Sequence, residues 1–310
     1  MLRAVLLAGL AAGTAPVVAA CTNTEDEPDP LRQLAATARR DARDAAALAE
    51  GDPSLAAQLR LVADTRKAHA TALQAEVDRE RPPDDAAPEP GPARGKAESV
   101  AQLGKALAAA EQAAMELVAR VPTYRAGLLG SVVAACASLR QLAPDLAAGQ
   151  EENEIEELRP AEGNTLAEDA VEVLQEALGA EHAAMWAYGL VSAYLPADFD
   201  EGLGKATAEH RARRDGAQRM LTVAGSTPRP AQPGYVPPED ITDQTSATTL
   251  VVQVEDDCTI AWRAVLEHTD NAELRGFALR ALTSSARRCA LWRAEAGEAP
   301  SVLALPGKPG

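Results

Sequence analysis

Four side chains in the second half of the chain have the types and spacing that buried metal or acid–base chemistry requires. Glu181 falls in the helical row of apolar positions within residues 174–189, so its carboxylate is predicted to point into a helix-bundle core. His210 lies in the apolar row of the next predicted helix, directly after Glu209, and Glu255 lies in a third. Glutamate and histidine from facing helices form the metal sites of several four-helix bundles. The sequence therefore places a candidate polar site inside a bundle.

The ligand set for two metal ions is incomplete. Such bundles use one Glu from each of two helices and a Glu-x-x-His pair from each of the other two, because side chains three residues apart project together. Neither residues 201–223 nor residues 272–294 contain a Glu-x-x-His pair. Arg288 instead lies on the inner face of the last helix, where a ligand is needed. We predict that its guanidinium pairs with Glu181 in place of a metal ion.

We interpret these side chains as a buried polar network that binds no metal ion or other cofactor and contains no catalytic residue. Its predicted members are Glu181, His182, Glu209, His210, Glu255 and Arg288. Such a network adds little net stability, but loss of one partner would leave a costly buried charge. Two alternatives stay open: a site for iron, manganese or zinc at Glu181, His210 and Glu255, and a contact to a small molecule.

A run of arginines follows His210. Arg211, Arg213 and Arg214 precede Asp215, a pattern typical of a surface ion-pair set that contributes little energy. The alternative is a site for an anionic ligand that uses Arg211 and Arg214.

Composition predicts an all-α protein that binds no nucleic acid. Alanine and leucine dominate the 310 residues, and aromatic residues make up only 3%, which favours helices over strands. A formal net charge of −16 argues against nucleic acid as a partner, because phosphate binding needs a basic surface. The predicted helices span residues 31–50, 53–78, 98–118, 123–142, 166–194, 201–223, 247–268 and 272–294.

The order of helices and links predicts two tandem four-helix bundles. In each group of four, the long, proline-rich link is the middle one, which matches two antiparallel pairs joined by a crossover. We place the domains at residues 31–148 and 166–297, an acidic linker at residues 149–165 and a flexible tail at residues 298–310. The match of LLGSVVAACASLR (128–140) to ALTSSARRCALWR (281–293) suggests an internal repeat.

The N-terminus predicts a lipid anchor. Residues 1–20 read as a signal peptide with one early arginine and an apolar run, and Val18-Ala19-Ala20-Cys21 resembles a bacterial lipobox. Cys21 would then carry the lipid and begin an acidic tether over residues 21–30. We therefore expect a protein on the extracytoplasmic face of the cell membrane. An ordinary signal peptide with an incidental cysteine is the alternative.

The remaining cysteines and one further histidine are predicted to be structural. Cys136, Cys258 and Cys289 are an odd number in an oxidising compartment, and we expect buried free thiols. A Cys136–Cys289 disulfide between equivalent helices of the two bundles is the alternative. His69 lies among buried positions and faces Asp41 and Glu111 at best, so we expect a satisfied core histidine.

Three segments together resemble a known family. AEHAAMWAYG (180–189), EHRARRD (209–215) and ARRCALWRA (286–294), with a proline-rich link between the last two, resemble the actinobacterial ferritin-like domain family of unknown function over roughly residues 165–297. The resemblance implies a ferritin-like four-helix fold, often carried on secreted or lipid-anchored proteins, and no established activity. Because the ferritin ligand set is incomplete, iron chemistry is not implied with the fold.

These observations predict a non-catalytic binding or scaffold module of the cell envelope. The chain contains no Gly-rich phosphate loop, no His-Glu-x-x-His and no serine-elbow pattern. The expected partners are the membrane, through the N-terminal lipid, and an envelope protein or a small ligand; the sequence predicts no oligomeric state. The alternative function is a ferritin-like metal-binding or oxidase domain with a reduced ligand set.

Overall fold

The computed structural model describes residues 29–80, 90–91, 95–147 and 165–308, and all regular structure in these ranges is helical. The α-helices are α1 (Pro30–Gly51), α2 (Ala56–Glu80), α3 (Val100–Val118), α4 (Thr123–Leu139), α5 (Glu168–Val191), α6 (Asp200–Val223), α7 (Gln244–His268) and α8 (Ala272–Glu295). Two short 3-10 helices follow α4 and precede α6, at Pro144–Ala147 and Ala197–Phe199. The all-α prediction is confirmed. The predicted signal peptide, Cys21 and nearly all of the acidic linker lie outside the described residues.

Side-chain caps mark the starts of four of the described α-helices, α1, α3, α7 and α8. Asp29 accepts a hydrogen bond from the Leu31 amide at the start of α1, and Asp243 and Ser246 form a reciprocal capping box at the start of α7. The start of α2 differs from the prediction at Pro53: the Asp52 carboxylate accepts from the Ser54 amide and holds a turn, so the regular helix begins at Ala56.

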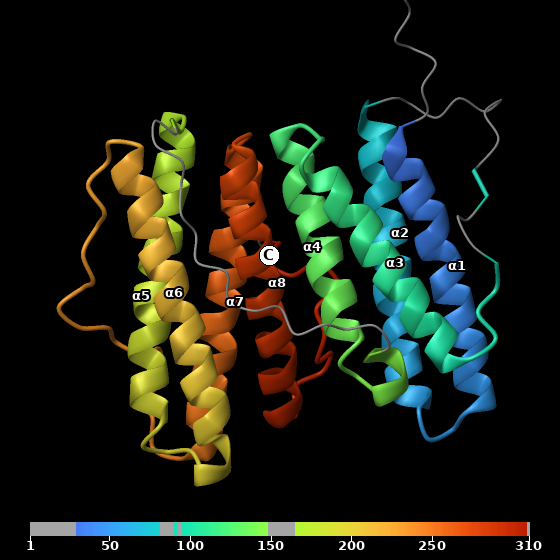
Figure 1. Ribbon diagram of the computed structural model, residues 1–310. Coiled ribbons are helices and arrows are strands. Elements are labelled where there is room, and N and C mark those ends of the chain that lie inside the picture. The colour runs from blue at the N-terminus through green and yellow to red at the C-terminus, as the bar shows by residue number, and fades with distance from the viewer. Residues whose placement is uncertain (1–28, 81–89, 92–94, 148–164, 309–310) are drawn as a thin grey trace, which may run out of the picture.

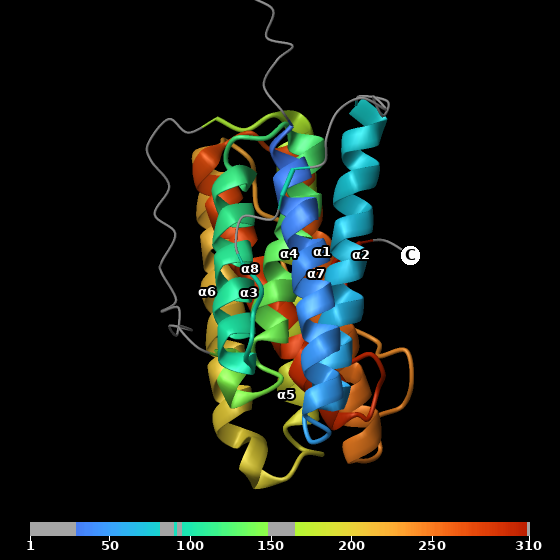
Figure 2. The same ribbon diagram turned by 90° about the vertical axis from the view of Figure 1, so that its right-hand side faces the viewer.

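The helices run roughly parallel or antiparallel to one another and are arranged side by side in a row (Figure 1). Helices α1–α4 contact one another, α5–α8 contact one another, and α4 also lies against α7 and α8. In Figure 1, α5 and α6 therefore lie at one end of the row and α1 and α2 at the other; Figure 2, turned by 90°, shows α1 and α2 facing the viewer. The order of long and short links is the predicted one, with a long link before α3 and before α7.

The two groups of helices share a hydrophobic core rather than meeting at a polar surface. One buried cluster extends from Leu31 of α1 through Leu129 of α4 to Trp262 of α7. Helix α4 approaches α7 closely because Gly130 has no side chain: a Cβ atom there would lie 2.5 Å from the Leu266 Cδ1 atom. The halves of the chain are therefore packed into one body.

The segment that follows α8 differs from the predicted flexible tail. Val302 is only 1% exposed, the Ala304 carbonyl lies 2.7 Å from His69 Nε2, and Ser131 donates to the Pro306 carbonyl at 2.6 Å. Residues 298–308 thus contact α2 and α4 in the first half of the chain. One buried valine and two carbonyl acceptors hold a segment that has no helical periodicity.

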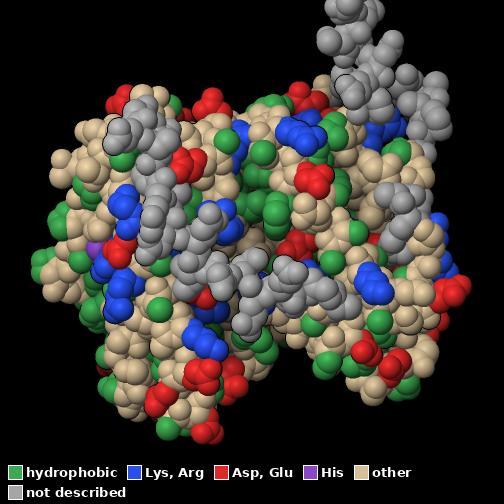
Figure 3. Space-filling view, viewed as in Figure 1, with side chains coloured by type: hydrophobic (Ala, Val, Ile, Leu, Met, Phe, Trp, Pro, Cys, Tyr) green, Lys and Arg blue, Asp and Glu red, His purple; other side chains and the backbone are tan. Residues whose placement is uncertain are grey.

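The visible surface carries both signs of charge. On the face shown in Figure 3, acidic and basic side chains are interspersed over the described residues. Among these residues, no helix combines the length and the hydropathy that a membrane span requires.

Candidate functional site

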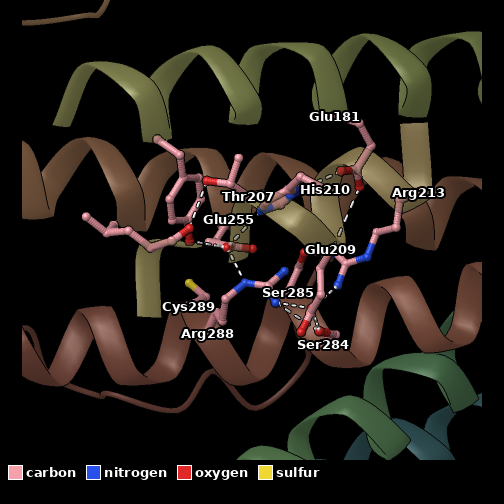
Figure 4. Close-up of polar contacts among 12 residues, drawn as sticks. Glu181, Thr207, Glu209, His210, Arg213, Glu255, Ser284, Ser285, Arg288 and Cys289 are labelled. Atoms are coloured by element: carbon pink, nitrogen blue, oxygen red, sulfur yellow. Dashed lines mark hydrogen bonds and ion pairs between the residues drawn. The ribbon is translucent and has the colours of Figure 1, made fainter. Parts of the chain in front are cut away.

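The predicted polar site exists, and four helices build it (Figure 4). Glu181 projects from α5, Glu209 and His210 from α6, Glu255 from α7 and Arg288 from α8. Glu181, His210 and Glu255 are all 0% exposed. The local cause is helical spacing, since each of the three lies in a row of apolar positions that the bundle must bury.

His210 bridges two carboxylates. Its Nδ1 lies 2.7 Å from Glu181 Oε2 and its Nε2 lies 3.1 Å from Glu255 Oε1. Both ring nitrogens face acceptors, so the imidazolium, which carries a proton on each nitrogen, satisfies both contacts. Burial by itself lowers the pKa of His210, but the charges of Glu181 and Glu255 and the hydrogen bonds to them raise it above its ordinary value.

The two bridged carboxylates have further donors. Trp262 Nε1 donates to Glu181 Oε1 at 2.6 Å, while the Tyr188 hydroxyl donates to Glu255 Oε1 at 2.5 Å. Burial works against ionisation of both, yet the cationic neighbours and these hydrogen bonds hold the pKa of Glu181 and of Glu255 below the usual range. Both groups are therefore carboxylates in the folded protein.

Two arginines meet at Glu209. Arg213 Nη2 donates to Glu209 Oε2 at 3.0 Å, and Arg288 Nη1 donates to the same oxygen. Arg288 Nε also donates to Glu255 Oε1 at 2.6 Å. With His210 protonated, the three glutamates balance the two arginines and the imidazolium, so the charges of this buried cluster sum to zero.

The predicted Arg288–Glu181 pair is wrong. Arg288 binds Glu255 and Glu209 instead, and Glu181 takes its cationic partners from α6: His210, and Arg213 at 3.8 Å. The reason is the order of the helices, because α8 packs mainly against α7 and α4 whereas α5 packs against α6 and α7.

Three other predicted site residues lie apart from this cluster. His182 is only half-buried, and burial together with the nearby Arg214 lowers its pKa. Arg211 is exposed, and Arg214 donates to Asp215 at 2.6 Å. His182 is therefore outside the buried network, and Arg214 is paired with its acidic neighbour, while an anion site at Arg211 and Arg214 stays a prediction.

Sequence reasoning missed the part that Cys258 takes in the site. One ligand atom each from Glu181, His210 and Cys258 lies within 4.8 Å of the other two, and all three residues are buried. Cys258 follows Glu255 by three residues on α7, so the two side chains share a helix face. A search for Glu-x-x-Cys, rather than Glu-x-x-His alone, would have found it. Arg213 was likewise expected only as part of a surface ion-pair set.

A second buried cluster lies in the first half of the chain. Arg66 donates to Asp41 Oδ2 at 2.8 and 3.1 Å, lies 2.8 Å from His69 Nδ1 and donates to Cys136 Sγ at 3.4 Å. His69 therefore contacts Arg66 rather than Asp41 or Glu111, because the guanidinium lies between the ring and Asp41. Burial and the charge of Arg66 lower the pKa of His69 to about 3, so the ring is neutral.

The three described cysteines are free thiols. Cys136, Cys258 and Cys289 are buried and form no disulfide with one another, as expected, and the alternative Cys136–Cys289 bond is wrong. The Cys136 thiol lies against Arg66, while Cys289 Sγ points toward the Val252 carbonyl at 3.8 Å. Burial raises the pKa of Cys136 to about 11 and that of Cys289 to about 12, so both are protonated near neutral pH.

Comparison with known proteins supports the family resemblance only in its coarser form. Residues 173–310 match the family described as Domain of unknown function (DUF4439). A conserved hypothetical protein from Mycobacterium tuberculosis, whose crystal structure is known, is 38% identical over 42% of this chain and 98% of its own, with a TM-score of 0.41. No curated protein is significantly similar. The second half of the chain thus carries a domain of this family, whose function is unknown.

Proposed function

We propose that the protein is a lipid-anchored, extracytoplasmic helical module that acts as a non-catalytic binding or scaffold component of the cell envelope. The observation that carries the non-catalytic part is the pairing of charges in the buried site. Glu181, Glu209 and Glu255 each bind a histidine or an arginine of this same chain. Acid–base or redox catalysis needs groups that can reach a substrate, and these carboxylates face other side chains of the bundle.

The proposal includes a ferritin-like ancestry for the second half of the chain. Helices α5 and α6 form one pair, α7 and α8 form another, and residues 224–243 connect the pairs. This order supports a ferritin-like bundle. Because Arg288 lies between Glu209 and Glu255, those two carboxylates are not available to bridge a pair of iron ions.

The anchor is tested on the full chain produced in a bacterium that processes lipoproteins. We expect mass spectrometry to find diacylglyceryl-modified Cys21 at the new N-terminus, and the protein to sediment with membranes. C21A is expected to lose the lipid and the sedimentation. An unmodified Cys21 in the mature protein would reject the anchor, and protection of the chain from protease in intact spheroplasts would reject the extracytoplasmic location.

The oxidase alternative is tested separately by aerobic oxidation of Fe²⁺. We expect the purified chain to consume oxygen no faster than buffer containing the same iron. Oxidation that the wild type accelerates and E255Q does not would favour the ferritin-like oxidase over the scaffold.

A further inference from the structure

Each half of the chain surrounds a buried site with the same three kinds of side chain. In the first half these are Asp41 on α1, His69 on α2 and Cys136 on α4. The side chain at their centre is a cation, because the Arg66 guanidinium donates to the carboxylate and to the sulfur and contacts the imidazole. An acidic, imidazole and thiol triad is thus held around one positive charge.

The corresponding triad in the second half has no guanidinium at its centre. Glu181 on α5, His210 on α6 and Cys258 on α7 bring their ligand atoms within 4.8 Å of one another. The residue three positions before the histidine, which is Arg66 in the first half, is Thr207 here. Its hydroxyl donates to the Leu203 carbonyl, so Thr207 supplies no charge to the triad.

Arg213, the nearest arginine on α6, donates its hydrogen bonds to residues outside the triad. Arg213 Nη1 stands 3.8 Å from Glu181 Oε1 and donates to Ser285 at 2.9 Å, while its Nη2 donates to Glu209. The protonated His210 Nδ1 donates to Glu181 Oε2 across 2.7 Å. A metal ion between these two atoms requires them to move apart by about 0.6 Å, from 2.7 Å to roughly 3.3 Å, which is the spacing of two ligand atoms in a tetrahedron with bonds of about 2.0–2.1 Å.

The surrounding residues are arranged as metal-site neighbours are. Metal-bound histidines usually donate their second ring N–H to a carboxylate, and His210 Nε2 faces Glu255 Oε1 in this way. Glu255 is itself fixed by Tyr188. The Glu181 oxygen that does not face His210 accepts from Trp262. These contacts orient one carboxylate oxygen and one ring nitrogen toward each other.

Charge balance also permits a divalent metal ion to replace two protons at this triad. A dication that enters while the His210 ring proton and the Cys258 thiol proton leave adds two positive charges and removes two, so the buried cluster stays neutral. The pairs of Arg213 and Arg288 with Glu209 need not change. Because an unbalanced charge in this fully buried place would be costly, exchange against two protons is the favourable route.

From this geometry we propose that Glu181, His210 and Cys258 form a site for one thiophilic divalent metal ion. Thiolate together with imidazole selects zinc-like ions over magnesium and calcium, which prefer oxygen ligands. The site is distinct from the iron, manganese or zinc alternative of the sequence, because Cys258 replaces Glu255 as the third ligand and Glu255 orients His210. It is independent of the lipid anchor and of the scaffold role.

Cobalt is the probe of choice, because a thiolate bound to Co²⁺ gives a charge-transfer absorption in the near ultraviolet. The full chain is unfolded in guanidinium chloride with a chelator, freed of both, and refolded with CoCl₂, since the ligands are fully buried once the protein has folded. We expect about one Co²⁺ per chain with the thiolate absorption, and loss of that absorption when Zn²⁺ is present together with Co²⁺ during refolding. Refolding with MgCl₂ instead should retain no metal after gel filtration.

Two variants and one control decide the assignment. C258A and E181Q are expected to weaken Co²⁺ binding by about 100-fold, because loss of a ligand should cost at least as much as loss of a group that only orients one, and C258A is expected to abolish the charge-transfer band. C289A, which removes a buried thiol of the same half, should bind Co²⁺ as the wild type does. Circular dichroism establishes that each variant has refolded. Failure of the folded wild type to retain about one Co²⁺ would overturn the proposal, as would C258A retaining wild-type affinity.

Discussion

Glu255 and Arg288 form a buried ion pair between α7 and α8, with Arg288 Nε 2.6 Å from Glu255 Oε1. The carboxylate is 0% exposed, so its charge depends on partners from this chain rather than on water. The same guanidinium reaches Glu209 of α6. One arginine thus connects three of the four helices in the second half of the chain.

Replacement of Arg288 by methionine is expected to lower the free energy of unfolding by about 3–5 kcal/mol, because it leaves a buried carboxylate short of a charge partner. Urea denaturation followed by circular dichroism measures the change. R211A, which alters an exposed arginine of α6, is the control and should stay within about 0.5 kcal/mol of the wild type. If R288M is no less stable than R211A, the ion pair has no structural role.

Because the pKa of the buried His69 is lowered, we predict that the protein loses stability in acid. Its pKa is about 3 in the folded protein because of burial and the charge of Arg66, whereas an unfolded histidine titrates near 6.5. Between these values the unfolded chain binds a proton that the folded chain does not, so the free energy of unfolding falls as the pH falls. One such proton contributes about 1.4 kcal/mol per pH unit within this window.

The measurement is the slope of unfolding free energy against pH from about 6 to 4. H69Q keeps a donor for the Ala304 carbonyl and removes the titrating ring, so its slope should be shallower than that of the wild type. H268Q, at an exposed position, is the matched control. Equal slopes for H69Q and the wild type would mean that His69 does not set this dependence.

Periodicity was sufficient to predict the helices and the meeting of Glu181 with His210. Each side chain lies in an apolar row that faces the core. Two charged groups buried in one bundle are expected to pair, because an unpaired buried charge is costly. The partner of Arg288 could not be predicted in this way. Which carboxylate it reaches depends on the order of α5–α8 around the bundle, and helical spacing fixes only the face of a helix, not its neighbour.

Helical periodicity could not predict two other features, which are the packing of residues 298–308 and the core that the two halves share. Residues 298–308 have no helical periodicity, because the short apolar run at residues 302–305 lies between Pro300 and the Pro306-Gly307 pair; their sequence therefore resembles a tail, although Val302 and Pro306 are buried. The sharing of one core by the two halves depends on the close contact at Gly130, and a glycine inside an alanine-rich helix does not identify its neighbour.

That contact gives a third prediction. A Cβ atom at Gly130 would lie 2.5 Å from Leu266 Cδ1 and 3.1 Å from Leu282 Cδ2, so G130V should destabilise the protein by about 1–3 kcal/mol through overpacking between α4 and its neighbours α7 and α8. G179A is the control, because a Cβ atom at Gly179 meets nothing within 4 Å. Loss of a helical glycine there should stabilise the protein by up to about 1 kcal/mol. Thermal denaturation of both variants measures the contrast, and equal melting temperatures would contradict the close packing.

The C-terminal segment gives the last prediction. Removal of residues 298–310 exposes the place of Val302, which is 1% exposed in the intact chain, and deprives His69 and Ser131 of their carbonyl partners. Lost burial of one valine contributes about 1.5–3 kcal/mol, and each lost hydrogen bond about 0.5–1.5 kcal/mol. We therefore expect the truncated chain to unfold at a clearly lower urea concentration. V302A in the full chain removes only part of the buried apolar surface, so its urea midpoint should lie between those of the wild type and the truncated chain. A truncated chain as stable as the wild type would show that the segment does not connect the halves.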